Sequence, residues 1–163
     1  MSNGELIRHA VTAAEIALAR VLFEEYASSI RVDLCFQNFS AELATLPGAY
    51  ARPRGALLLA GTALHPRGCV ALRPLPDGDP LIGEVKRLYV RADARGSGLG
   101  RALVLRILAE ASAIGYRELK LDTLPTMAAA RALYASLGFR ECAPYYRNPL
   151  DGVVYMSLAI PCS

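Results

Sequence analysis

Hydrophobic residues recur along the chain at two different spacings, and these spacings divide it into expected helices and strands. The strongest helical pattern covers residues 98–115, where apolar side chains return every three or four positions. These positions are Leu99, Leu103, Val104, Ile107, Leu108, Ala111 and Ile114. Gly115 follows them and is expected to end the helix, because glycine accepts the left-handed backbone of a helix C-terminus.

Weaker patterns predict three further helices. Thr12 and Glu15 have the spacing of a capping box, which marks a helix N-terminus. The helix behind them is expected to bury one face, made of Leu18, Val21, Leu22 and Tyr26. A short helix is expected at residues 40–46, before a Pro-Gly pair, and another at residues 130–137, before Gly138.

Apolar runs bounded by turn residues predict seven strands. They cover residues 6–11, 55–62, 68–75, 81–90, 117–123, 139–143 and 153–160, and residues 65–68 are expected to form a hairpin turn. Because a helix separates strands 81–90 and 117–123, these two strands should pair in parallel. The sequence therefore predicts an α/β fold with a mixed, mostly antiparallel central sheet of about seven strands flanked by about four helices.

Composition and charge exclude several classes of protein. The 163 residues suit one domain covering residues 1–163, and a net charge of +3 without a basic run argues against nucleic-acid binding. Four cysteines outside any CxxC pair, beside only two histidines, argue against a metal site. No signal peptide or membrane span is visible, so we expect a cytoplasmic protein that does not bind membranes.

The candidate chemistry begins at the sequence Arg95-Gly96-Ser97-Gly98-Leu99-Gly100, directly before the best-defined helix. Glycines let backbone N–H groups converge on one point, and a helix N-terminus carries partial positive charge, so the loop suits a pyrophosphate. Arg101 stands where a P-loop has its lysine and where a dinucleotide loop has its third glycine, which excludes both motifs. The alternative is a glycine-rich turn that only caps the helix.

With its neighbours, this loop resembles the GNAT superfamily of N-acetyltransferases. The similarity covers about residues 81–142 and has three parts in order: Leu88-Tyr89-Val90, then the glycine loop after a four-residue spacer, then residues 132–139, ALYASLGF. The resemblance implies an acetyltransferase fold whose two parallel strands splay apart at the cofactor cleft. It also implies acetyl-CoA as cofactor and transfer of its acetyl group to an amine, by direct attack in a ternary complex.

The resemblance places coenzyme A along one strand and on the glycine loop, with the pyrophosphate on backbone N–H groups and the pantetheine arm beside the strand. The residues implied are Leu88, Tyr89, Val90, Arg95, Gly96, Ser97, Gly98, Leu99, Gly100, Arg101, Thr126 and Tyr134. Relatives often carry an asparagine seven residues before the helix tyrosine, and here that position is Met127. Thr126 is adjacent and either substitutes for it or caps the helix.

Two residues are candidates for proton transfer. Tyr134 matches the family tyrosine that protonates the leaving thiolate, although its apolar helix face also suits a core aromatic. Some relatives place a general-base glutamate at the position of Glu84, which alternation puts on the same face as Lys86, Leu88 and Val90. The alternatives are that Glu84 is a solvated residue paired with Lys86 or Arg117, or that a water chain replaces it.

The acceptor site is expected from the first helical pair and the last hairpin, with a small-molecule amine or an amino-acid-like acceptor more suitable than a protein. Its candidate residues are Tyr26, Phe36, Gln37, Tyr145, Tyr146 and Asn148. Arg87 or Arg147 is a candidate for binding an acceptor carboxylate. A module that binds acyl-CoA without catalysis is the competing function, and the resemblance allows a homodimer.

Overall fold

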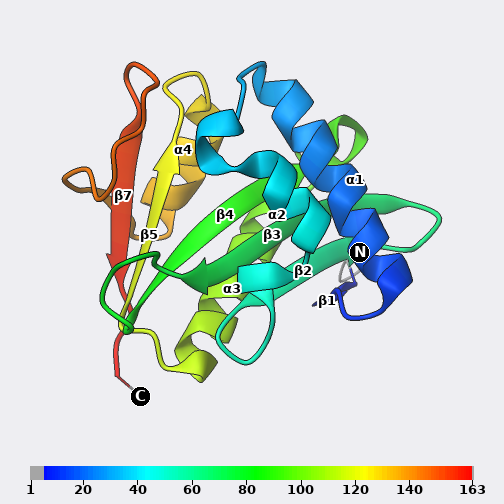
Figure 1. Cartoon of the computed structure of the whole chain (residues 1–163), viewed down its shortest axis with the longest axis horizontal. Helices are drawn as coiled ribbons and strands as arrows, with labels where there is room; N and C mark the ends of the chain where they lie inside the picture. Colours follow the sequence, from blue (N-terminus) through cyan, green and yellow to red (C-terminus); the bar gives the residue numbers. More distant parts are fainter. Residues whose placement is uncertain (1–5, 163) are drawn as a thin grey trace.

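The computed structural model describes residues 6–162, with the side chain of Phe36 excepted, as one seven-stranded sheet between two helical layers (Figure 1). The strands are β1 (Ile7–His9), β2 (Ala56–Gly61), β3 (Pro66–Pro74), β4 (Ile82–Val90), β5 (Glu118–Thr123), β6 (Arg140–Glu141) and β7 (Val154–Ala159). The helices are α1 (Ala13–Ile30), α2 (Phe39–Thr45), α3 (Leu99–Ile114) and α4 (Ala128–Ser136), with short 3-10 turns η1 (Cys35–Gln37), η2 (Gly48–Tyr50) and η3 (Ala92–Ala94).

The sheet has the order β1-β2-β3-β4-β5-β7-β6, and β4 with β5 is its parallel pair. All other neighbouring strands are antiparallel. The predicted fold class, a mostly antiparallel sheet with flanking helices, is therefore confirmed.

Each face of the sheet carries its own apolar core. On one face, Leu103 and Ile107 of α3 pack with Tyr134 of α4 against the sheet. On the other face, Leu22 and Phe23 of α1 pack against the alternate strand positions, with η2 beside them. The two cores leave the middle strands covered on both sides, which explains the nearly continuous apolar run of β2.

Local signals in the sequence set the helix ends. Thr12 and Glu15 form the predicted capping box, and Gly115 ends α3 with a left-handed φ of 107°. The buried face of α1 differs from the prediction, because Val21 is 44% exposed while Ile16 and Ala19 are buried. Apolar residues of α1 occur on more than one face of the helix. Their spacing alone therefore did not identify the face that is buried.

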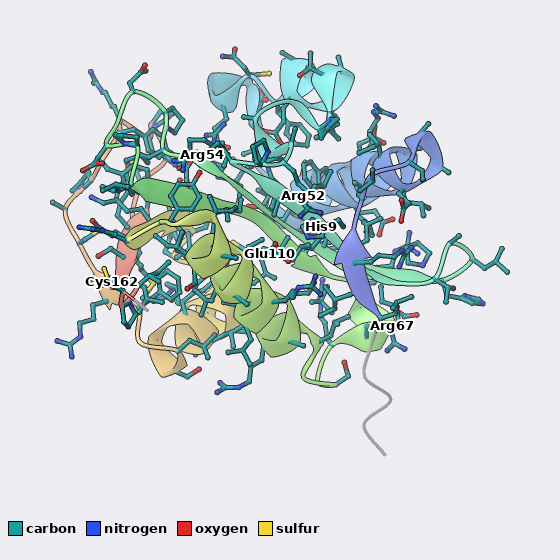
Figure 2. All side chains as sticks on the ribbon, turned by 90° about the horizontal axis from the view of Figure 1, so that it is seen from below. His9, Arg52, Arg54, Arg67, Glu110 and Cys162 are labelled. Atoms are coloured by element: carbon teal, nitrogen blue, oxygen red, sulfur yellow. The ribbon has the colours of Figure 1, made fainter. Side chains whose placement is uncertain are left out.

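The edge strand β1 is tied to α3 by polar contacts. His9 Nε2 lies 3.0 Å from Glu110 Oε1, and Arg106 also binds Glu110 (Figure 2). Figure 2 shows α3 crossing the face of the sheet, with Glu110 directed toward His9. No helix within residues 6–162 is long and apolar enough to cross a membrane.

The parallel pair opens partway along its length. Only the first three residues of β4, Ile82–Glu84, pair with β5, at Glu118–Lys120. Residues 85–90 of β4 have no partner in β5. The predicted splay of these two strands is therefore present. It leaves an unpaired strand edge beside the glycine loop.

The predicted hairpin turn at residues 65–68 is wrong, because Pro66 already begins β3. The turn is made by residues 62–65: Thr62 N donates to the His65 carbonyl at 3.2 Å, and His65 N donates to Thr62 Oγ1 at 3.0 Å. Gly61, with a φ of 92°, shifts the register just before the turn. Pro66 fits the irregular start of the strand, where a missing donor costs little.

The prediction that Glu84, Lys86, Leu88 and Val90 share one face is also wrong. Two residues of β4, Arg87 and Leu88, oppose the single residue Val70 of β3 between the Lys86–Ala71 and Tyr89–Cys69 pairs. β4 therefore contains a bulge, where Arg87 has a left-handed φ of 62°. Before the bulge, Glu84 and Lys86 face the α2 side. After it, Leu88 and Val90 pack in the α3 core. One inserted residue therefore reverses the alternation.

Candidate functional site

The glycine loop forms an open helix N-terminus. Gly96 and Gly98 have φ values of 80° and 85°, and a Cβ added to either would meet nothing within 4 Å, so backbone conformation rather than crowding requires glycine. Gly98 is the N-cap of α3 and makes no side-chain capping bond. The first N–H groups of the helix, at residues 99–101, have no intrahelical acceptor and are available to an anion.

The side chains of the loop mostly hold its shape. Arg95 Nε donates to the Val90 carbonyl at 3.1 Å, and Ser97 Oγ donates to the Ala94 carbonyl at 2.5 Å. Arg101 Nη1 donates to Ser136 Oγ of α4 at 3.3 Å. These contacts anchor the loop to β4 and α4, and two guanidinium groups stay near the helix N-terminus.

A cleft of about 720 Å³ runs from this loop between the end of α1, β4 and α4. It contains six of the predicted cofactor residues, namely Leu88, Tyr89, Val90, Arg95, Gly100 and Thr126. The sequence did not predict the other lining residues, Ser29, Ile30, Arg31, Met127, Ala128, Ala129, Ala130 and Leu133. Thr126 does not cap α4, whose N-cap is Met127 without a side-chain bond. The unpaired edge of β4 thus faces a cleft whose volume is in the range of small-ligand sites.

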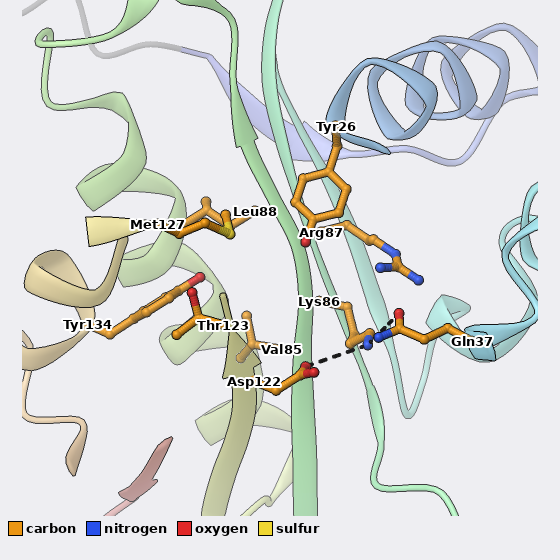
Figure 3. A pocket seen from close by; sticks show the side chains of 10 residues that line it. All are labelled: Tyr26, Gln37, Val85, Lys86, Arg87, Leu88, Asp122, Thr123, Met127 and Tyr134. Atoms are coloured by element: carbon orange, nitrogen blue, oxygen red, sulfur yellow. Dashed lines mark hydrogen bonds and ion pairs between the residues drawn. The ribbon is translucent and has the colours of Figure 1, made fainter. Parts of the chain in front are cut away.

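A smaller cavity lies at the splay itself (Figure 3). Its walls are Tyr26, Gln37, Val85, Lys86, Arg87, Leu88, Asp122, Thr123, Met127 and Tyr134. Figure 3 shows Tyr134, Thr123 and Met127 on one side of β4, with Tyr26, Lys86 and Gln37 on the other. The cavity therefore connects the two faces of the sheet where β4 and β5 separate.

Tyr134 serves both the core and this cavity. Its ring packs edge-on against Phe139 with centroids 5.5 Å apart, and its side chain is buried. Burial raises the pKa of Tyr134, so the hydroxyl stays protonated near neutral pH and can act as a donor. Thr123 Oγ1, also buried in the cavity wall, has no hydrogen-bond partner. An unsatisfied buried hydroxyl is costly unless a ligand or water binds it.

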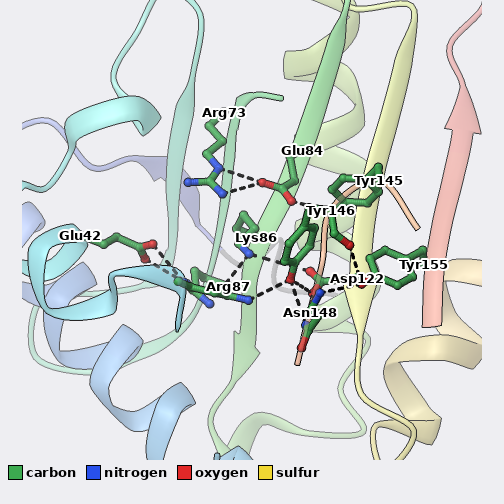
Figure 4. Close-up of polar contacts among 11 residues, drawn as sticks. Glu42, Arg73, Glu84, Lys86, Arg87, Asp122, Tyr145, Tyr146, Asn148 and Tyr155 are labelled. Carbon is green, nitrogen blue, oxygen red and sulfur yellow. Dashed lines mark hydrogen bonds and ion pairs between the residues drawn. The ribbon is translucent and has the colours of Figure 1, made fainter. Parts of the chain in front are cut away.

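The α2 side of the splay holds a buried network of charges (Figure 4). Arg73 binds Glu84 through Nε at 2.8 Å and Nη2 at 2.7 Å. Arg87 binds Glu42 in a two-pronged contact, at 2.9 and 3.0 Å. Each guanidinium in the network is thus paired with its own carboxylate, as burial of charge requires.

Glu84 lies at the centre of this network and is 1% exposed. Oε1 accepts from Arg73, and Oε2 accepts the Tyr145 hydroxyl at 2.6 Å. Neither partner is Lys86 or Arg117, the two expected from the sequence. Arg73 lies directly opposite Glu84 in the β3–β4 register, and the loop before β7 brings Tyr145 to the other oxygen. Burial and the carboxylate of Glu84 raise the pKa of Tyr145, so that hydroxyl remains a donor.

Lys86 and Asp122 form a looser pair, with Nζ and Oδ1 3.8 Å apart. Lys86 Nζ also donates to Gln37 Oε1 at 3.2 Å, and burial lowers the pKa of Lys86. Asp122 Oδ2 accepts from the Tyr146 hydroxyl and, at 3.0 Å, from Asn148 Nδ2. Two predicted acceptor residues, Tyr146 and Asn148, therefore donate to Asp122. A third, Gln37, contacts Tyr146 and Lys86 beside it.

Sequence reasoning missed Asp122, Lys86 and Thr123 as site residues. Their only signal was position, since Asp122 and Thr123 end β5 beside the splay. Of the remaining acceptor candidates, Tyr26 lines the cleft and the cavity, whereas the side chain of Phe36 lies outside the described residues. Arg87 is engaged with Glu42 and Arg147 is exposed.

Comparison with known proteins adds to this geometry. The model of the acetyltransferase (GNAT) family matches residues 20–139. An uncharacterised N-acetyltransferase of Schizosaccharomyces pombe is 45% identical over 143 residues, which cover 85% of each chain.

Solved structures agree on the fold. A GNAT-family acetyltransferase of Staphylococcus aureus has a TM-score of 0.77 at 16% identity, covering 96% of this chain and 99% of its own. A putative acetyltransferase of Salmonella typhimurium, determined with acetyl-CoA as its cofactor, has a TM-score of 0.69 at 22% identity and covers 98% and 95%.

Proposed function

We propose that this chain, which belongs to the acetyltransferase (GNAT) family, transfers the acetyl group of acetyl-CoA to a primary amine in a ternary complex. One observation carries the proposal: the uncapped N-terminus of α3 opens onto a cleft that leads along β4 to the cavity at the splay. The acetyl-CoA bound by the Salmonella relative supports the same cofactor here.

The cleft fits the parts of coenzyme A. The N–H groups of residues 96–101 would hold the pyrophosphate, with Arg95 and Arg101 adding charge. Leu88, Tyr89 and Val90 would pair with the amide groups of the pantetheine arm as an added strand. Bound acetyl-CoA supplies a reactive thioester, and the cleft would direct it toward Tyr134.

Acetyl transfer needs two proton movements. The amine nitrogen forms an amide bond to the acetyl carbon while the carbon–sulfur bond breaks. The amine loses one proton and the sulfur gains one, so a donor near the sulfur speeds the step. Tyr134 is our candidate donor because its hydroxyl is protonated and lines the cavity.

Glu84 is our candidate base. Its position favours this role, whereas its existing hydrogen bonds restrict direct contact with the amine. Its carboxylate lies on the acceptor side of β4, close to the splay. Both of its oxygens already accept hydrogen bonds, from Arg73 and Tyr145. Glu84 would therefore act through Tyr145 or a water molecule rather than by direct contact with the amine.

A second function is acyl-CoA binding without turnover. It is favoured because both oxygens of Glu84 already accept hydrogen bonds, and because Met127 stands where relatives often have asparagine. The two functions differ in one measurement. We expect acetyl-CoA to raise the melting temperature and, with an amine present, to release thiol. Thermal stabilisation without thiol release for any amine would favour the sensor, and no stabilisation by acetyl-CoA would contradict both.

A further inference from the structure

Thr123 ends the row of β5 side chains that faces α3 and α4. Side chains alternate along a strand, and the two preceding members of this row, Leu119 and Leu121, are buried in the apolar core. Thr123 is itself only 6% exposed. Valine has the same branched shape, suits a strand equally well and would fill this position without a polar atom. The hydroxyl of Thr123 therefore needs an explanation other than packing.

This hydroxyl has no hydrogen-bond partner among the described residues. Thr123 Oγ1 is buried, and no donor or acceptor of the protein binds it. Burial of an unpaired hydroxyl is unfavourable, so such groups in proteins usually bind water or a ligand. Because Thr123 lines the cavity at the splay, a group that enters the cavity can supply the missing partner.

The cavity offers few donors on the α3 side of β4. Among the described residues that line it there, Val85, Leu88 and Met127 have no hydrogen-bond donor in their side chains. Thr123 and Tyr134 have one hydroxyl each, and Figure 3 shows these hydroxyl groups directed toward each other. The charged side chains of the wall lie on the opposite face of the sheet. The α3 side therefore presents two neutral donors in an apolar setting.

Two adjacent donors match the two heteroatoms of a thioester. The sulfur and the carbonyl oxygen are bonded to the same carbon, so the groups that bind them must lie side by side. Tyr134 is the proposed donor to the sulfur, which leaves the carbonyl oxygen for Thr123. In the proposed site the amine approaches from the α2 side, so a hydroxyl on the α3 side would contact the acetyl group rather than the amine.

Resting on the acetyl transfer proposed above, we propose that Thr123 is a further catalytic residue, whose hydroxyl donates a hydrogen bond to the carbonyl oxygen of the acetyl group. The acetyl carbon gains its bond to the amine nitrogen as its bond to sulfur breaks, and the carbonyl oxygen carries negative charge in the transition state. A donor already in place stabilises that charge more than it stabilises the neutral carbonyl. Thr123 keeps its own proton throughout, so the proton balance of the reaction is unchanged.

The infrared band of the acetyl carbonyl tests this contact directly. A hydrogen bond to a carbonyl oxygen lowers its stretching frequency, and a ¹³C label at the carbonyl carbon of acetyl-CoA separates this band from those of the protein. In the complex without amine, the band should move to higher frequency in Thr123→Val. It should stay in place in Thr123→Ser, which keeps the hydroxyl, and in Tyr134→Phe, which removes the neighbouring one. An unchanged band in Thr123→Val would overturn the inference and favour another donor, such as a backbone N–H of the unpaired β4 edge.

Kinetics and stability test the catalytic role. Thr123→Val should lower kcat about 100-fold, and Thr123→Ser should recover most of the loss. The melting temperature of the free Thr123→Val protein should not fall, because the change removes an unsatisfied buried hydroxyl. Thr45→Val, the same change at an exposed position of α2, is the control and should keep full kcat.

Two kinetic outcomes separate this inference from the proposed function. Full kcat in folded Thr123→Val would overturn the inference and leave acetyl transfer standing. Absence of thiol release by the parent protein with every amine would overturn acetyl transfer and the catalytic role of Thr123 together.

Discussion

The two sides of β4 at the splay are built in different ways. On the α3 side, the expected pyrophosphate site comes from one continuous stretch, residues 95–101, and its binding groups are backbone N–H groups at a helix N-terminus. On the α2 side, the candidate acceptor site consists of side chains from η1, α2, β3, β4, β5 and the loop before β7.

The difference follows from what each side must recognise. A pyrophosphate is bound by backbone dipoles, which a short local motif can orient. An acceptor must be distinguished from others by charge and shape, which requires side chains placed around it. The pyrophosphate site can therefore be predicted from a few adjacent residues. The acceptor site forms only when segments distant in the sequence fold together.

The largest expected effect lies between the two sides, at Tyr134. Tyr134→Phe removes the hydroxyl and keeps the ring against Phe139, so kcat should fall about 10²- to 10⁴-fold with little change in the KM for acetyl-CoA. Steady-state kinetics and thermal unfolding would be measured together. Full kcat in a folded variant would show that Tyr134 is only a core residue.

The next effect breaks the cofactor side alone. Gly98→Asp should weaken acetyl-CoA binding about 100-fold, because it adds a carboxylate where the pyrophosphate is expected. Gly115→Asp is a matched control at the other end of α3, with a similar left-handed φ and equally open space. Both should lose about 1–2 kcal/mol of stability, so calorimetric affinity separates the roles. Equal affinities in the two variants would refute the phosphate site.

A smaller effect is expected on the acceptor side, at Glu84. Glu84→Gln keeps the shape and removes proton acceptance, so kcat should fall about tenfold and the low-pH decline of the pH–rate profile should disappear. The decline arises because a carboxylate base is lost when protonated. Tyr145→Phe, which removes the donor to Oε2, tests the connection to the amine. A profile unchanged by Glu84→Gln would instead support proton loss through water.

The smallest effect concerns stability away from both sites. Thr12→Ala should cost about 1 kcal/mol by removing the N-cap of α1 and leave kcat unchanged. The capping bonds from Thr12 lower the pKa of Glu15 to about 2. Since the folded pKa is lowered, this contribution is present above the unfolded value of about 4.3 and is lost as pH falls toward 2. Alanine keeps the backbone N–H that is the main cause of this low pKa, so unfolding measured at pH 7 and pH 2.5 should show both proteins losing stability at the lower pH, with little change in the difference between them.

The sequence by itself determined the element order, the capping of α1 and α3, the parallel pair and the glycine loop, because each depends on neighbouring residues or on periodic apolar positions. The tertiary structure alone decided the rest. The bulge at Arg87 placed Leu88 and Val90 on the opposite face of β4 from the one that alternation predicts. Glu84 is hydrogen-bonded to Arg73 and Tyr145 rather than to Lys86 or Arg117. Asp122 became an acceptor-site residue only through contacts with Tyr146 and Asn148. Side-chain partners across a sheet depend on register and bulges, which a one-residue shift inverts and which no local pattern encodes.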